Sequence, residues 1–318
     1  MTDGADDPGF AHEPVMCAEV VELLAAVPDG VVVDATVGGG GHSGALLDEH
    51  PGIELIGLDR DEAALAAASV RLATHAQRVT LRRARFDELA SIVGELGHEA
   101  LTGCLFDLGV SSPQLDQPAR GFSYRRAGPL DMRMDRSQGR RATDIVNGLD
   151  ERDLVDLLRR NADEPHARRI ARAIVAARPL HTTTELAEVV RDAVPAPARR
   201  HGGHPARRTF QAIRIEVNEE LEALERALGR AIDLLGPLGR CVVLSYHSGE
   251  DRIVKRMFRD AAGEAPPPRP GLPPPPGTTA VVRPLWRGTR TPDHAEIERN
   301  PRAEAARLRA VERLPESA

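Results

Sequence analysis

The chain has 318 residues and a formal net charge of −6, and 41% of its residues are hydrophobic. This length suffices for one large or two medium domains with an apolar core, and the composition is ordinary for a globular protein. No run of about 18 apolar residues occurs, so we expect no membrane-spanning helix. Aromatic residues make up only 3%, which limits the number of side chains that can stack on nucleic-acid bases.

The charge is divided unevenly along the chain. Residues 115–214 contain 20 arginines and 13 acidic residues, a net charge of +7, so the remainder carries −13. The planar guanidinium group of arginine suits phosphate recognition. The division indicates a polyanionic partner that meets one part of the protein, although solvated helix faces would also account for it.

The three cysteines, Cys17, Cys104 and Cys241, lie far apart, and two of them fall in apolar runs. This pattern is typical of buried free thiols in a reducing compartment. We therefore predict neither a disulfide nor a metal site.

The first part of the chain alternates apolar runs with helical segments. We predict strands at 31–33, 53–58, 79–83 and 101–107, and helices at 17–27, 43–49, 61–76 and 87–96. Such an alternation predicts a doubly wound α/β fold, in which a parallel sheet carries helices on both faces.

The alternation stops near residue 115. Up to residue 214 no buried strand is evident, and helices are predicted at 150–160, 164–177 and 184–193. The core pattern resumes with an amphipathic helix at 217–235, ended by Gly236-Pro237, a strand at 241–245, a helix at 250–260, and strands at 279–283 and 306–311. Eight prolines within 265–277 indicate a stiff, extended loop.

The predicted domain organisation follows from this change of rhythm. Residues 1–114 and 215–318 form the two parts of one core, and residues 115–214 form a helical, basic insertion domain.

A glycine-rich stretch at residues 31–44 is the first candidate for a ligand site. A short β-branched strand ends at Asp34, and Gly38–Gly41 allow the backbone to turn and approach a ligand closely. His42 and Ser43 open the next helix, whose N-terminal N–H groups favour polar or anionic groups.

This stretch supports three interpretations. Gly39, Gly41 and Gly44 spell the G-x-G-x-x-G pattern of a dinucleotide site. An acid at the strand tip would face a pyrophosphate, whereas S-adenosylmethionine has no phosphate and carries a sulfonium and an ammonium cation. Asp34 therefore favours S-adenosylmethionine, with a dinucleotide or a plain glycine turn as the alternatives.

Further candidate residues follow the other predicted strands. Ligands of doubly wound sheets bind beyond the carboxyl ends of the strands, so Asp34, Asp59, Phe86 and Asp107 are expected to face one crevice. Asp59 is suited to accept the two hydroxyls of a ribose. Phe86 would lie against an adenine or belong to the core.

The segment from Asp107 to Gln114 resembles the Asp/Ser-Pro-Pro-aromatic loop of enzymes that methylate exocyclic amines, with Gln114 in place of the aromatic residue. The lone pair of such an amine is delocalised into the base. Acceptors that bind its N–H groups favour rehybridisation and align the nitrogen with the methyl donor, and a carboxylate such as Asp107 can take the released proton.

Longer strings carry a resemblance to a known family over nearly the whole chain. They are His12-Glu-Pro-Val, Asp34-Ala-Thr-Val-Gly-Gly-Gly-Gly-His-Ser, Asp107-Leu-Gly-Val-Ser-Ser-Pro-Gln-Leu-Asp, Arg120-Gly-Phe-Ser-Tyr, Gly128-Pro-Leu-Asp-Met-Arg-Met-Asp, Arg208-Thr-Phe-Gln-Ala-Ile-Arg-Ile and Ser245-Tyr-His-Ser. With these strings the chain closely resembles the RsmH (MraW) family of 16S ribosomal RNA cytosine-N4 methyltransferases.

The resemblance implies a Rossmann-like core that binds S-adenosylmethionine, with a helical insertion. The implied substrate is a cytidine in the decoding region of 16S rRNA in the small ribosomal subunit. The implied setting is cytoplasmic, with no membrane, and a homodimer is compatible with it. The family's cofactor residues map onto Gly40, Gly41, His42, Asp59, Phe86, Asp107 and Gln114.

Other residues are candidates on their own chemistry. Phosphate contacts are expected at Arg199, Arg200, Arg207 and Arg208, or these are plain solvated charges. Asp131, Arg133 and Asp135 would shape the mouth of the pocket or form structural ion pairs. Ser245, Tyr246 and His247 would border the target base or form a packed corner.

The interpretation that the sequence favours is an S-adenosylmethionine-dependent rRNA methyltransferase with Asp107 as the catalytic residue. The alternatives are a methyltransferase of DNA or of small-molecule amines, and a non-catalytic ribosome-assembly factor that keeps the S-adenosylmethionine pocket.

Overall fold

A computed structural model describes residues 14–109, 116–137, 139–199, 203–264 and 279–315. It divides into two compact units. We call Met1–Gly109 with Leu221–Ala318 the sheet unit, and Val110–Glu220 the helical unit. The proline-rich stretch 265–277 and the candidate residues Gln114 and Arg200 lie outside the described residues.

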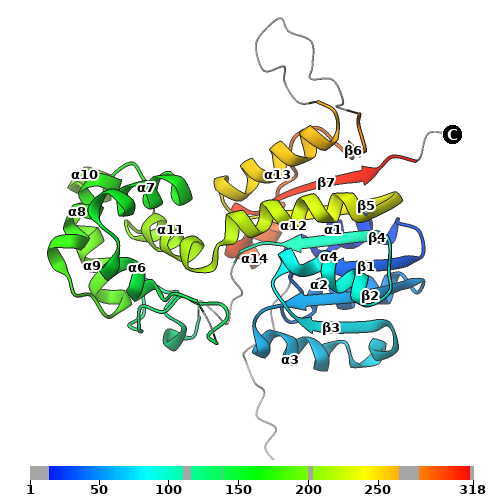
Figure 1. Cartoon of the computed structure of the whole chain (residues 1–318), viewed down its shortest axis with the longest axis horizontal. Coiled ribbons are helices and arrows are strands. Elements are labelled where there is room, and N and C mark those ends of the chain that lie inside the picture. The colour runs from blue at the N-terminus through cyan, green and yellow to red at the C-terminus, as the bar shows by residue number, and fades with distance from the viewer. Residues whose placement is uncertain (1–13, 110–115, 138, 200–202, 265–278, 316–318) are drawn as a thin grey trace, which may run out of the picture. The chain divides into compact units, whose positions relative to one another are not determined.

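One sheet of seven strands forms the centre of the sheet unit, in the order β3-β2-β1-β4-β5-β7-β6 (Figure 1). The strands are β1 (Gly30–Asp34), β2 (Ile53–Asp59), β3 (Val79–Arg83), β4 (Leu101–Asp107), β5 (Leu235–Ser245), β6 (Val282–Pro284) and β7 (Arg307–Arg313). Strands β1 to β5 pair in parallel, and β7 runs antiparallel to both β5 and β6. The predicted doubly wound α/β fold is confirmed.

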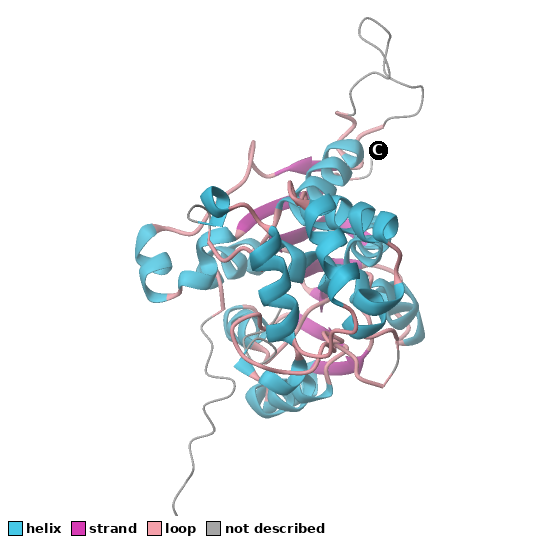
Figure 2. Ribbon diagram, turned by 90° about the vertical axis from the view of Figure 1, so that its left-hand side faces the viewer, coloured by secondary structure: helices cyan, strands magenta, loops and turns pink. Residues whose placement is uncertain are grey.

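Both faces of the sheet are covered by helices, which flank the magenta strands in Figure 2. One face packs against α4 (Leu89–Glu95), α12 (Glu220–Leu234) and α13 (Ser248–Ala261). The other packs against α1 (Cys17–Ala25), α2 (Gly41–Glu49) and α3 (Glu62–Arg71). Parallel strands buried on both faces require continuous apolar runs, which is why β1 and β4 are readable from the sequence.

The short elements of the sheet unit complete the connections. They are the 3-10 helices η1 (Ala73–Arg78), η2 (Phe86–Glu88) and η4 (Pro301–Ala305), and the helix α14 (His294–Arg299). The predicted helix 61–76 is thus shorter than expected, because Leu72 leaves the α conformation and a 3-10 segment follows.

The helical unit has its own apolar core. Its helices are η3 (Pro118–Arg120), α6 (Ala142–Gly148), α7 (Glu151–Ala162), α8 (Ala167–Ala177), α9 (Thr183–Ala193), α10 (Ala196–Arg199) and α11 (Arg207–Asn218). Within its described residues, β structure is limited to an isolated bridge between Pro129 and Thr182.

Two boundary predictions around residues 217–245 are wrong. The expected helix 217–235 is two helices, because Glu219 has the left-handed φ of 52° and ends α11 before α12 begins. Gly236-Pro237 does not separate the helix from a later strand but lies inside β5, which begins at Leu235 beside Leu101. A register shift in this pairing accommodates the irregular backbone there.

The cysteines are free thiols, and Cys104 and Cys241 are buried neighbours on β4 and β5. In the described part of the chain, no helix is both long and apolar enough to cross a membrane.

Candidate active site

The carboxyl ends of β1, β2 and β4 bring three acids to one edge of the sheet. Asp34 ends β1, Asp59 ends β2 and Asp107 ends β4. Because β1 lies between β2 and β4 and all three run parallel, these ends meet at the same edge. The sequence-predicted gathering of strand tips is therefore present in the fold.

Asp34 holds the glycine loop in place through hydrogen bonds. Its carboxylate is 2% exposed, accepts a hydrogen bond of 2.6 Å from the Ser43 hydroxyl and one of 3.2 Å from the Thr36 N–H. Burial raises the pKa of Asp34, against the opposing effect of the Ser43 hydrogen bond. Asp34 thus ties the end of β1 to the start of α2, so its role at the strand tip includes holding the loop in shape.

Glycine is required in this loop for two reasons, backbone conformation and close packing. Gly38 has a left-handed φ of 51°, a conformation that other residues rarely adopt, and among the described residues a Cβ there would meet the Thr36 carbonyl oxygen at 3.8 Å. At Gly41 a Cβ would lie 2.5 Å from Pro14 Cγ, so packing demands glycine. Gly40 is left-handed as well, with its Cβ position 3.2 Å from Leu72.

Asp59 faces this loop with both carboxylate oxygens engaged by backbone N–H groups. Oδ2 accepts from Gly38 at 3.1 Å and Oδ1 from Asp61 at 2.8 Å. Burial raises the pKa of Asp59 from 3.8 to about 6, more than these hydrogen bonds lower it. Each carboxylate oxygen keeps a second lone pair, so the group can still accept two hydroxyls.

Asp107 is held from both sides. Its backbone N–H donates to Thr36 Oγ1 at 2.6 Å, and its Oδ1 accepts from the Tyr246 hydroxyl at 2.7 Å. Its Oδ2 lies 3.6 Å from His42 Nδ1. The Asp107 side chain remains 27% exposed, so it can meet a substrate.

His42 is buried at the start of α2 and points its two ring nitrogens in different directions. Nε2 lies 2.9 Å from the Val15 carbonyl, and because a carbonyl oxygen only accepts, Nε2 carries a proton. Nδ1 is the atom turned toward Asp107.

Phe86 begins η2, beyond the end of β3. Its ring meets Phe106 edge to face, with ring centroids 6.1 Å apart, and it packs half-buried against the core on one face of the sheet. One side of the ring belongs to the core, so both sequence-based interpretations of Phe86 stay compatible with its position.

Sequence reasoning missed two of these interactions. Thr36 and Tyr246 both hold Asp107, from positions 71 and 139 residues away in the chain. The Asp-Ala-Thr string after β1 is a signal for Thr36, whereas nothing local links Tyr246 to Asp107.

The predicted arginines of the helical unit differ in how their guanidinium groups are used. Arg199 donates to the carbonyls of Val194 and Asp192, at 2.7 and 3.2 Å, and thereby caps α9. Arg208 donates to the Asp163 carbonyl at 3.3 Å, and Arg207 is exposed at the start of α11.

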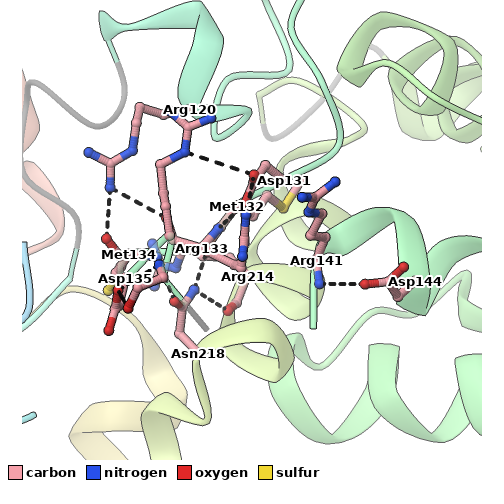
Figure 3. Close-up of polar contacts among 12 residues, drawn as sticks. Arg120, Asp131, Met132, Arg133, Met134, Asp135, Arg141, Asp144, Arg214 and Asn218 are labelled. Carbon is pink, nitrogen blue, oxygen red and sulfur yellow. Dashed lines mark hydrogen bonds and ion pairs between the residues drawn. The ribbon is translucent and has the colours of Figure 1, made fainter. Parts of the chain in front are cut away.

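The Gly128–Asp135 segment carries a buried polar network (Figure 3). Arg133 binds Asp131 through two hydrogen bonds, Nε to Oδ1 at 2.8 Å and Nη2 to Oδ2 at 3.0 Å, with both side chains about nine-tenths buried. Asn218 accepts from the Met134 N–H and donates to the Met132 carbonyl. For Asp131 and Arg133, this geometry favours the interpretation as a structural ion pair over a role at the mouth of the pocket.

Comparisons with known proteins agree on one family. Residues 9–314 match the model of the MraW methylase family. The chain is 52% identical to the Ribosomal RNA small subunit methyltransferase H of Thermobifida fusca, over 97% of this chain and 95% of the relative. It is 49% identical to the protein of the same name from Mycobacterium marinum, over 99% of this chain and 84% of that relative.

Among solved structures, an rRNA methylase from Streptococcus thermophilus aligns over 93% of this chain and 95% of its own length, with 14% identity and a TM-score of 0.42. A likeness this weak adds nothing on function. The family match covers almost the whole chain, and relatives with half of their residues identical cover it equally well. The chain belongs to the MraW methylase family.

Proposed function

We propose that this protein methylates the N4 amine of a cytidine in the decoding region of 16S rRNA, with Asp107 as the catalytic residue. Its family membership and its relatives make it an rRNA methyltransferase that uses S-adenosylmethionine. The observation that supports the finer statement is the carboxylate of Asp107, which is anchored at a strand end, partly exposed and beside the glycine loop.

The site residues fit S-adenosylmethionine. The absence of a side chain at Gly38 allows a ligand to approach the backbone, and the remaining lone pairs of Asp59 suit the two ribose hydroxyls. The proposed cofactor set is Gly40, Gly41, His42, Asp59, Phe86, Asp107 and Gln114, with the exposed side of Phe86 toward the adenine. When bound, S-adenosylmethionine supplies an electrophilic methyl group.

The chain's own part in the reaction is to orient an amine and take its proton. Asp107 accepts a hydrogen bond from the N4 amine, which favours rehybridisation of the nitrogen and aligns its lone pair with the methyl carbon. The C–N bond forms as the C–S bond breaks, and the proton lost by the nitrogen passes to the Asp107 carboxylate. Unstacking the cytidine costs roughly a few kcal/mol.

The helical unit is proposed to hold the RNA backbone. Arg199, Arg200, Arg207 and Arg208 are the proposed phosphate-binding residues, and exposed Arg207 has the clearest geometry for it. Replacing Arg207 and Arg208 by glutamine is expected to weaken RNA binding at every sequence. The slope of log K against log salt concentration should become shallower by roughly one for each phosphate that is no longer neutralised.

Arg191 provides a matched control in the same unit, because this exposed arginine is paired with Asp192 at 3.0 Å. The Arg191→Gln variant should keep the wild-type salt slope. Equal slopes for all three proteins would remove Arg207 and Arg208 from the interface.

Methyl transfer assays decide between the candidate functions. Radiolabelled transfer is expected to small-subunit particles, and mass spectrometry of 16S rRNA from cells without the protein should show the loss of one methyl group from a cytidine. Transfer to DNA alone would favour the DNA methyltransferase alternative. Absence of transfer to immature and mature subunits would favour a non-catalytic assembly factor.

The setting belongs to the same proposal. Association with the small ribosomal subunit places the enzyme in the cytoplasm. A homodimer, which the family resemblance allows, is tested by sedimentation of the purified protein.

A further inference from the structure

The corner after β5 reaches across to the residue proposed to take the proton. Strands β4 and β5 are parallel neighbours, with Asp107 beside Leu244, so Tyr246 emerges at the same edge two residues later. The Tyr246 hydroxyl donates to Asp107 Oδ1 at 2.7 Å. The hydrogen bond joins side chains from two adjacent strand ends, which are among the most rigid parts of the fold.

Tyr246 is itself held in place by a buried carboxylate. Glu250, which is 3% exposed, accepts hydrogen bonds from the Tyr246 N–H at 2.8 Å and the His247 N–H at 3.3 Å. His247 Nδ1 accepts from the Glu250 N–H at 3.4 Å, which caps α13. The Tyr246 ring also packs against Gly109, where a Cβ would lie 3.2 Å from the ring.

The two oxygens of Asp107 therefore have different surroundings. Oδ1 is occupied by the Tyr246 hydroxyl, while Oδ2 lies 3.6 Å from His42 Nδ1. The Asp107 backbone is fixed by Thr36. Rotation of the carboxylate would break the hydrogen bond to Tyr246, so this bond selects one orientation of the group.

We propose that Tyr246 is a positioning residue for methyl transfer: its hydroxyl fixes the orientation of the Asp107 carboxylate toward the cytidine amine. This inference rests on the proposed function and adds a residue to it. Tyr246 acts through Asp107 and need not touch the substrate.

Several titratable groups lie around the pair. Asp34 and His42 lie around Asp107, and Glu250 and Glu296 lie around Tyr246. Burial, together with the negative charge of Asp107, raises the pKa of Tyr246 well above its ordinary value of 10. Tyr246 therefore remains a donor throughout the pH range in which an enzyme works.

The test is the Tyr246→Phe variant, which keeps the ring and removes the donor. We expect kcat for methylation of small-subunit particles to fall roughly 10- to 100-fold, the loss typical of one hydrogen bond to a charged group. KM for the particles and Kd for S-adenosylmethionine should stay within about twofold, because neither ligand binds the Tyr246 hydroxyl. The acid limb of the kcat profile should move to higher pH, because a carboxylate without this donor holds its proton more tightly.

The chain's one other tyrosine supplies the control, since the sequence contains two. The Tyr124 ring stacks on His204 and meets Phe210 edge to face, an arrangement that phenylalanine preserves. Tyr124→Phe should therefore match the wild type in kcat and in its pH profile.

Two results would overturn the inference. One is a Tyr246→Phe enzyme with wild-type kcat and an unmoved acid limb. The other is a loss of S-adenosylmethionine affinity and of Tm that matches the loss of kcat, which would make Tyr246 a purely structural residue. Failure of the wild-type enzyme to methylate the particles would instead count against the proposed function.

Discussion

Two buried acids at strand ends of the sheet unit and Asp131 of the helical unit are held in opposite ways. In the sheet unit, Asp34 and Asp59 accept hydrogen bonds from N–H groups and a hydroxyl, and burial raises the pKa of both. In the helical unit, burial acts on Asp131 in the same direction, but the hydrogen bonds and charge of Arg133, together with the charge of Arg136, outweigh burial and lower the pKa of that acid. Asp131 is thus neutralised by a cation, as is Glu312 of the sheet unit, which binds Arg240 and Arg283. Asp34 and Asp59 are held by N–H groups and a hydroxyl instead.

This difference distinguishes acids that stabilise the fold from acids that can bind a ligand. Asp131 accepts three hydrogen bonds from Arg133, two from its guanidinium and one from its N–H, so this ion pair serves to stabilise a chain segment. Asp59 accepts one N–H at each oxygen and keeps a lone pair on each for ribose hydroxyls, at a cost in stability. Three substitutions test this distinction.

The largest effect is expected for Asp107→Ala. Without the carboxylate, the amine is neither oriented nor deprotonated, and we expect turnover to fall by about 10²- to 10⁴-fold. The free energy of unfolding should fall by about 1–3 kcal/mol, because the buried Tyr246 hydroxyl loses its acceptor. Methyl transfer to small-subunit particles measures the loss. Near-normal methylation by this variant would remove Asp107 from the mechanism.

In the helical unit, Arg133→Ala should affect stability instead. It leaves the Asp131 carboxylate buried, with Arg136 4.0 Å away, so we expect a loss of about 3 kcal/mol in the free energy of unfolding. Urea denaturation measures this. As a control, Arg191→Ala removes the exposed ion pair with Asp192 and should leave the urea midpoint of unfolding unchanged. A wild-type midpoint for Arg133→Ala would show that the network does not hold the segment.

A smaller effect is expected for Asp59→Ala. Loss of the acceptor for the ribose hydroxyls should weaken S-adenosylmethionine binding roughly 10- to 100-fold, as measured by calorimetry. Unchanged affinity would contradict the ribose assignment.

The same variant has a second readout in the pH dependence of stability. The folded state holds the Asp59 proton more tightly than the unfolded chain, with a pKa of about 6 against 3.8. Stability is therefore lost as pH rises through this window, by about 3 kcal/mol for this group. Between pH 4 and pH 7 the wild type should lose more stability than Asp59→Ala. Parallel curves would mean that Asp59 is not perturbed by burial.

Much of the fold can be predicted from the sequence because its signals are local. Strands β1, β2 and β4 are largely apolar runs of the expected length, and the acids that end them follow those runs directly. Since parallel strands end at one edge, their sequence positions alone predict that Asp34, Asp59 and Asp107 gather.

Local signals fail where a neighbour distant in sequence decides the conformation. The break at Glu219 and the early start of β5 at Leu235 depend on a left-handed residue and on pairing with β4. The antiparallel direction of β7 likewise results from its pairing with β5 and β6.

By itself, the sequence determined the doubly wound core, the glycine loop and the family. Only the tertiary structure decided which distant donors hold the acids at the strand ends: the Gly38 N–H for Asp59, and a tyrosine 139 residues away for Asp107. The physical reason is that covalent order sets which side chains end a strand, whereas packing of distant segments sets which donors reach them.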